Sequence, residues 1–129
     1  MTNDEIHDFL QQAIDENRVM LFMKGTPEAP ACGFSARASG ALNALGVQYA
    51  ALDILPDARI REELSGLSGW PTIPQLFVDK ELVGGSDIVI EMFESGELAE
   101  LLGVEQPEES PEPAVEPAKR PIGLENRLD

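Results

Sequence analysis

The 129-residue sequence has a single cysteine, Cys32. A single cysteine excludes an internal disulfide. It also excludes a zinc site or an iron–sulfur cluster held entirely by one chain, because such sites need several thiolate or imidazole ligands. Cys32 therefore needs a thiol from another molecule to complete a redox cycle, and ligands from another molecule to complete a metal site.

Positive charge and long apolar runs are also scarce. Nine Lys and Arg residues stand against 24 Asp and Glu residues, which gives a formal net charge of −15. We therefore expect no nucleic-acid partner and no membrane partner, and no apolar run approaches the roughly 20 residues of a membrane-spanning helix. Residues 1–5 are polar and acidic, unlike a secretory signal or an Arg-rich transit peptide. Together with the single cysteine, this predicts a cytoplasmic location.

Hydrophobic periodicity predicts alternating helices and strands in the first hundred residues. The predicted helices are 3–17, 36–45, 56–64, 87–94 and 97–102, and the predicted strands are 19–23, 47–54, 75–78 and 81–83. We expect Asn3 and Ser86 to cap helices, Pro56 to open one, residues 25–30 to be a loop and residues 66–74 to be irregular. The order predicts an α/β fold: a four-stranded mixed sheet with two parallel strands, an added antiparallel hairpin, and helices on both faces.

The composition changes after Gly103. Residues 105–129 hold five prolines, seven acids and three bases, which predicts one domain over residues 1–104 and a disordered acidic Pro-rich tail over residues 105–129. Within the tail, Pro121-Ile122-Gly123-Leu124 is slightly apolar. It is either a short docking segment or part of a solubilising tail, and composition favours the second interpretation.

Cys32 is the first candidate for chemistry. It lies between a loop and a helix, where exposed backbone N–H groups and the helix dipole stabilise a thiolate. Lys24, at the end of a strand, adds a positive charge nearby. The alternative is a buried, inert cysteine, but Pro30 and Gly33 on either side are unusual in a core segment and favour the reactive interpretation.

Three further features allow a functional and a plain interpretation. Pro71 and Pro74 bracket an aperiodic stretch; frequency alone predicts a trans Ile73–Pro74 bond, whereas a cis bond would offer the Ile73 backbone to a peptide-like ligand. Gly84-Gly85-Ser86-Asp87 lets the backbone approach a ligand closely, but it also suits an ordinary Ser cap followed by a first-turn acid. Arg61 either binds a ligand or forms an exposed i,i+4 pair with Asp57.

Together these segments resemble the CGFS-type monothiol glutaredoxins over residues 3–102. The shared motifs, in the family's order and spacing, are Lys24-Gly25-Thr26-Pro27, Cys32-Gly33-Phe34-Ser35, Trp70-Pro71-Thr72-Ile73-Pro74-Gln75 and Gly84-Gly85-Ser86-Asp87. The resemblance implies a thioredoxin-like fold and a glutathione site. The tail is not covered by it.

The resemblance also implies a role for each matching residue. Lys24 and Arg61 match positions that hold the glycine carboxylate of glutathione, and Ile73 matches the residue before a cis-proline, whose backbone pairs with the cysteinyl part. Ser86 and Asp87 match the pair that binds the γ-glutamyl end. Many members have cysteine at the position of Ser86, so this chain lacks any disulfide between that position and the active cysteine.

The resemblance further implies that Cys32 is the catalytic cysteine and an iron ligand. A [2Fe–2S] cluster takes four thiolates; in the family, two chains and two glutathiones supply them, and a homodimer forms around the cluster. The implied function is transfer of the cluster to acceptor apoproteins, with a BolA-type protein as a further partner. The alternative is a glutathione-dependent thiol–disulfide oxidoreductase, and the long loop before Cys32, which accompanies poor turnover in the family, predicts weak enzymatic activity at most.

Overall fold

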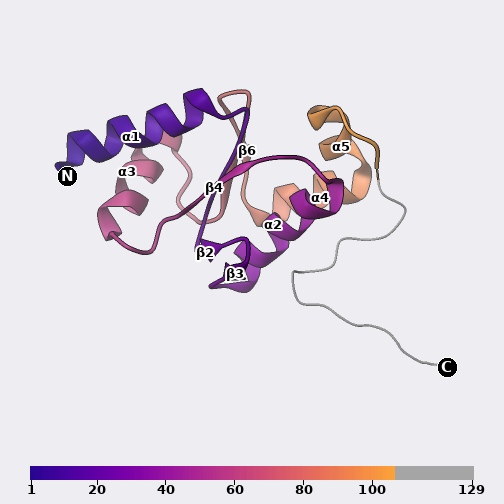
Figure 1. Cartoon of the computed structure of the whole chain (residues 1–129), viewed down its shortest axis with the longest axis horizontal. Coiled ribbons are helices and arrows are strands. Elements are labelled where there is room, and N and C mark those ends of the chain that lie inside the picture. Colours follow the sequence, from indigo (N-terminus) through magenta and orange to yellow (C-terminus); the bar gives the residue numbers. More distant parts are fainter. Residues whose placement is uncertain (107–129) are drawn as a thin grey trace.

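The computed structural model describes residues 1–106, and the rest of the predicted tail lies outside the described part. Helices and strands alternate in the predicted order (Figure 1). The helices are α1 (Asn3–Glu16), α2 (Gly33–Leu45), α3 (Ala58–Ser68), α4 (Ser86–Ser95) and α5 (Glu97–Leu102). The strands are β1 (Val19–Met23), β2 (Gly25–Thr26), β3 (Ala29–Pro30), β4 (Ala50–Asp53), β5 (Gln75–Val78) and β6 (Glu81–Gly84). No helix in residues 1–106 is long and apolar enough to span a membrane.

The four longer strands form one mixed sheet in the order β4-β1-β5-β6. β1 and β4 are parallel, with Met20 opposite Ala50. β5 runs antiparallel to β1, and the β5–β6 hairpin adds the last strand antiparallel. The predicted mixed sheet is therefore confirmed, and its two halves meet at β1 and β5.

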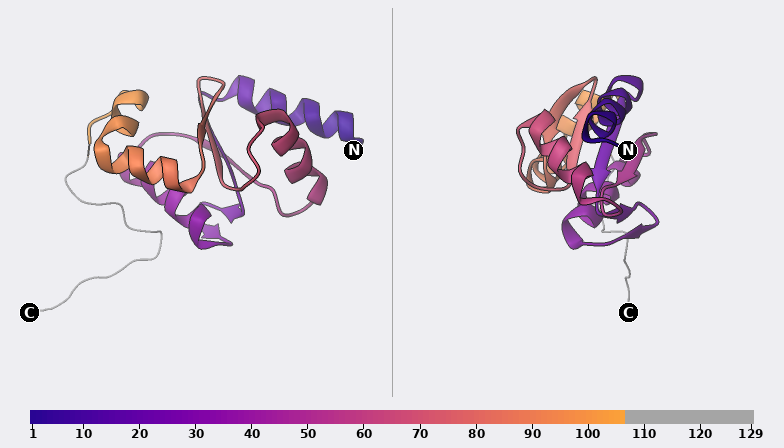
Figure 2. Two further views of the ribbon diagram at one scale, coloured as in Figure 1. Left: turned by 180° about the vertical axis from the view of Figure 1, so that it is seen from behind. Right: turned by 90° about the vertical axis from the view of Figure 1, so that its left-hand side faces the viewer.

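Helices cover both faces of this sheet. Residues of β1 alternate between the faces: Leu21 and Met23 pack with α2, α4 and α5, whereas Met20 and Phe22 pack with α1 and α3. Every residue of β1 is buried for that reason. Figures 1 and 2 show α1 and α3 together on one side of the strands and α2, α4 and α5 on the other.

Two predicted helix starts are corrected by their caps. α1 is capped by Thr2, not Asn3: the Thr2 hydroxyl accepts from the Glu5 amide at 3.1 Å, and the Glu5 carboxylate accepts from the Thr2 amide at 2.7 Å. This reciprocal pair satisfies two backbone donors, which one Asn cap does not. α3 is capped by the Asp57 carboxylate, so Pro56 precedes the helix instead of opening it.

Other boundaries also differ from the prediction. α2 begins at Gly33, three residues early, and α3 extends to Ser68, which shortens the irregular stretch before β5. Residues 25–30, predicted as a loop, form the short β2–β3 hairpin, in which Gly25 has φ +85°. A Cβ at Gly25 would lie 2.5 Å from the Ala29 carbonyl oxygen, so only glycine fits. This hairpin leads the chain directly into Cys32.

Arg18 ties the end of α5 to the segment between α1 and β1 and to the β5–β6 turn. Its guanidinium donates to the carbonyl oxygens of Leu101 and Leu102, both at 3.2 Å, and to the Asp79 carboxylate at 3.3 Å. Asp79 belongs to the β5–β6 turn, which the sequence predicted, and it has a positive φ as that turn requires. The end of α5 therefore lies beside the end of α1.

Candidate functional site

Cys32 is the N-cap of α2, with extended backbone. Its Sγ accepts a hydrogen bond from the Ser35 amide at 3.4 Å, so the sulfur stands where a capping oxygen usually lies. The side chain is partly exposed. The predicted placement at a helix N-terminus is thus observed, and the cysteine is not a core residue.

The hydroxyl of Ser35 makes a second contact with the sulfur, at 3.4 Å. The same hydroxyl oxygen accepts from the backbone N–H of Lys24 at 3.0 Å. The bond from Lys24 does not use the hydroxyl proton, so Ser35 can donate it to the sulfur when Cys32 is a thiolate. Ser35 is fully buried, so water does not compete for it. The sequence analysis quoted Ser35 only as part of a motif and assigned it no role.

These contacts lower the pKa of the Cys32 thiol. Partial burial of the sulfur raises it, but the hydrogen bonds from the Ser35 hydroxyl and from the Ser35 and Phe34 amides, together with the charge of Lys24, outweigh burial. A thiol with a lowered pKa is more fully ionised at neutral pH. The geometry therefore favours a thiolate, the form that attacks disulfides and binds metals.

Replacing Ser35 by alanine is expected to raise the pKa of Cys32, because the thiolate loses a charge-assisted hydrogen bond. Alkylation by iodoacetamide near neutral pH should slow several-fold, and the pH midpoint of the rate should move upward. Ser35→Thr keeps the hydroxyl and should restore much of the rate. Equal midpoints for the parent and the Ser35→Ala variant would contradict the hydroxyl's role.

A cavity of about 350 Å³ is lined by Phe34 and Lys24, both of which act on the Cys32 sulfur, although Cys32 is not itself one of the lining residues. It brings together all five residues predicted to hold glutathione: Lys24, Arg61, Ile73, Ser86 and Asp87. Phe34, Thr72 and Pro74 complete the lining. Since α3 and α4 cover opposite faces of the sheet, the cavity receives a cation from one face and an acid from the other.

Arg61 does not pair with Asp57, so the plain interpretation of Arg61 is wrong. Asp57 instead binds Arg59 at 2.8 Å, which is possible because Asp57 caps the helix and lies beside its first turn. Arg61 donates to the Pro71 carbonyl oxygen at 3.3 Å. Its remaining guanidinium N–H groups are therefore available at the cavity.

The Ile73–Pro74 peptide bond is cis. The expectation from frequency was wrong here, and the one from the resemblance is confirmed. Within the described residues, the Ile73 N–H and C=O form no hydrogen bond with another residue. Both groups belong to a residue that lines the cavity, and they suit an extended peptide-like ligand.

Gln75 braces the loop that carries Ile73. The Gln75 side chain is fully buried, and its amide nitrogen donates to the Trp70 and Thr72 carbonyl oxygens at 3.0 and 3.1 Å. The loop also packs against Gly85, where an added Cβ would lie 3.1 Å from the Trp70 ring nitrogen. Sequence reasoning missed Gln75 because its partners are backbone groups of a segment without periodicity.

The sequence predicted Ser86 as the cap of α4, and this prediction is wrong. Gly85 holds the cap position, and α4 begins at Ser86 without a side-chain cap. The first-turn backbone N–H groups of α4 therefore have no capping side chain as partner. With the Ser86 hydroxyl, these amides can receive a ligand carboxylate, while Asp87 can receive an amino group.

Cys32 is the only thiol in the sequence that can bind a metal. No group of three or more His, Cys, Asp or Glu side chains comes together in this part of the chain. Cys32 is nevertheless a suitable iron ligand, since it is ionisable and partly exposed.

Comparison with known proteins identifies the family. The family model described as Glutaredoxin matches residues 19–83. The chain belongs to the glutaredoxin family. It is 52% identical over 94 residues to a probable monothiol glutaredoxin 2 of Rickettsia typhi, covering 73% of this chain and 85% of that one. It is 55% identical over 93 residues to glutaredoxin 4 of Escherichia coli K12, covering 72% and 81%.

Solved glutaredoxin structures share this architecture. A monomeric truncated mutant of Trypanosoma brucei 1-C-Grx1 has 42% identity and a TM-score of 0.67, with 82% of this chain and 96% of that chain covered. Reduced poplar apo GrxS14 has 40% identity and a TM-score of 0.66, with 74% and 88% covered. The thioredoxin-like fold and the monothiol glutaredoxin resemblance inferred from the motifs are thereby confirmed.

Proposed function

We propose that this glutaredoxin binds a [2Fe–2S] cluster between two copies of the chain and passes it to acceptor proteins. The observation that carries the proposal is a single thiolate beside a cavity suited to glutathione. Four thiolates are needed; two Cys32 sulfurs and two glutathione thiols supply them. Because half of these ligands diffuse freely, the cluster is labile, which suits a carrier.

The cavity supports glutathione as the missing ligand. Glutathione has a carboxylate at its glycine end and both an amino group and a carboxylate at its γ-glutamyl end. Lys24 and Arg61 suit the first carboxylate, and Ser86 and Asp87 suit the γ-glutamyl end. The free Ile73 backbone groups suit the peptide between the two ends.

A second copy has an apolar contact available beside the sulfur. Phe34 lines the cavity and is 61% exposed, and an exposed aromatic side chain is a common anchor in interfaces. The homodimer forms around the cluster, and a BolA-type protein takes the place of one copy in the alternative complex. We place this carrier in the cytoplasm, as the composition suggests.

Anaerobic reconstitution with iron, sulfide and glutathione tests the proposal. The product is expected to be brown, to elute as a dimer, and to contain glutathione and chain in a ratio of about one to one, because each iron takes one protein and one glutathione thiolate. Absorbance, gel filtration and thiol analysis give these quantities. The proposal fails if the same cluster forms equally well without glutathione or any added thiol.

A further inference from the structure

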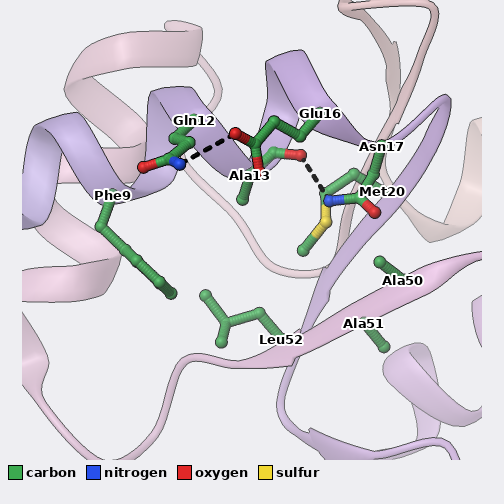
Figure 3. Close-up of a pocket in the computed structure, with 9 residues that line it drawn as sticks. All are labelled: Phe9, Gln12, Ala13, Glu16, Asn17, Met20, Ala50, Ala51 and Leu52. Carbon is green, nitrogen blue, oxygen red and sulfur yellow. Dashed lines mark hydrogen bonds between the residues drawn. The ribbon is translucent and has the colours of Figure 1, made fainter.

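A second groove lies away from Cys32, between α1 and the edge strand β4. Its volume is about 320 Å³. Figure 3 shows Phe9 of α1 and Leu52 of β4 facing one another across it, with Met20 and Ala50 deeper along the strands. None of the residues assigned to glutathione lines this groove.

The floor of the groove is apolar and incompletely covered. Phe9 is 45% exposed, although it lies on a helix whose neighbouring apolar residues are buried. β4 is the end strand of the four-stranded sheet, and Ala50 and Leu52 are only partly buried. Side chains and free strand edges of this kind favour an extended, partly apolar segment as the occupant.

The α1 wall of the groove carries one carboxylate, Glu16, on a helix that is acidic along its length. α1 has five carboxylates and no Lys or Arg. Asp15 and Glu16 lie in its last turn, where the helix dipole disfavours negative charge, and their side-chain hydrogen bonds come from the neutral amides of Gln11 and Gln12. A cation from outside the helix would therefore be stabilised at this end.

The chain carries a segment with the complementary chemistry. All three bases of residues 105–129 fall within residues 119–128, which hold one acid and so have a net charge of +2. Ile122, Leu124 and Leu128 lie between and beside these bases. Residues 105–118 in contrast have five acids and no base, so of the two stretches only residues 119–128 match an apolar groove that ends at Glu16 on an acidic helix.

The described chain ends close enough for this segment to reach. Arg18 holds the end of α5 beside the end of α1, next to Asn17, which lines the groove. Fourteen residues lie between Gln106 and Pro121, and a fully extended chain of that length reaches at most about 50 Å. Gln106 lies at α4, where its side chain donates to the Phe93 carbonyl oxygen at 3.1 Å, so the linker has to cross to the α1 side of the sheet, which its extended length allows.

We propose that the α1–β4 groove binds residues 119–128 of the same chain. Ile122 and Leu124 cover Phe9 and Leu52, and Lys119 and Arg120 lie against the acidic end of α1. The tether gives an effective concentration on the order of millimolar, so a segment of only millimolar intrinsic affinity is docked about half of the time. The interaction does not depend on glutathione or on a cluster.

Nuclear magnetic resonance of the full-length protein tests the proposal. The double variant Ile122→Asp/Leu124→Asp is expected to reduce docking more than about tenfold, since two apolar side chains become charged. The amide signals of residues 12–17 and 50–53 should shift accordingly. Lys119→Glu/Arg120→Glu should shift the same signals, whereas Val115→Asp, the matched apolar change outside the segment, should leave them in place.

A nitroxide attached at Asn126→Cys, in a Cys32→Ser background, locates the occupant directly. Groove amides should broaden more strongly than those of α4 on the other face, and equally after about tenfold dilution, because the tether keeps the local concentration constant. If the amide signals of residues 12–17 and 50–53 have the same chemical shifts in the double variant as in the parent, the proposal is overturned. Broadening that disappears on dilution would also overturn it, since the occupant would then be the segment of a second copy.

Discussion

The Arg61→Ala variant is expected to retain glutathione roughly ten- to a hundredfold less well than the parent. A charge-assisted hydrogen bond contributes about 1.5–3 kcal/mol, and 1.4 kcal/mol is about tenfold in affinity. Arg61 lines the cavity and uses only one donor on the Pro71 carbonyl. Asp87→Ala should have a similar effect from the γ-glutamyl end. Cluster decay rate and bound glutathione are the measurements.

Arg59→Ala is the charge-matched control. Arg59 lies on the same helix but binds Asp57 and the Met1 carbonyl oxygen, outside the cavity. The Arg59→Ala substitution should therefore leave glutathione retention nearly unchanged. If Arg59→Ala is as damaging as Arg61→Ala, the effect is one of net charge and the assignment of Arg61 is wrong. Circular dichroism should show that both variants keep the apo fold, because both residues are surface residues of α3.

The Gln75→Ala variant is expected to lose both stability and glutathione binding. The Trp70 and Thr72 carbonyl oxygens lose their donor, and an unsatisfied buried group costs about 1–3 kcal/mol. The loop that carries Ile73 then loses the hydrogen bonds that hold it in place. If this costs the binding free energy of about one hydrogen bond, glutathione should bind about tenfold more weakly. Urea unfolding and calorimetric titration with glutathione give the two quantities.

Gln75→Glu separates the brace from simple packing. The carboxylate has nearly the shape of the amide but no N–H, and it faces two carbonyl oxygens. Burial raises the pKa of such a carboxyl above the ordinary value of about 4.3. The protonated form is thus favoured in the folded state. Compared with the parent, the variant should therefore be most stable below about pH 4.3 and should lose stability as the pH rises through the raised pKa. A variant as stable as the parent near neutral pH would show that the amide donor is unimportant.

The order of elements and the mixed sheet could be predicted from local patterns. Residues 19–23 are a short apolar run between turn residues, which indicates a strand buried on both faces, and β1 is such a strand. The Asp79-Lys80 turn followed from its position between two apolar runs. The start of α1 could not be predicted in the same way, because Thr2 and Asn3 are both good caps and only the Glu5 side chain decides between them.

The residues that line the candidate glutathione site could be predicted, but the residues that hold them in place could not. The family resemblance was enough to name Lys24, Arg61 and Asp87, which the fold brings to one cavity. The contacts of Ser35 and Gln75 could not be predicted, because each binds backbone groups whose positions depend on the tertiary fold. Arg61 shows the same limit, since its partner is a carbonyl ten residues away and not the nearby carboxylate.

The Arg18 guanidinium links α5 to the β5–β6 turn, which lies earlier in the sequence. α5 has no basic residue in its own last turn, and the guanidinium of Arg18 supplies the positive charge at that end. The same guanidinium holds Asp79. Opening α5 therefore releases one end of the β5–β6 hairpin as well, and the first, middle and last parts of the domain should unfold as one cooperative unit and not by fraying from the C-terminal helix.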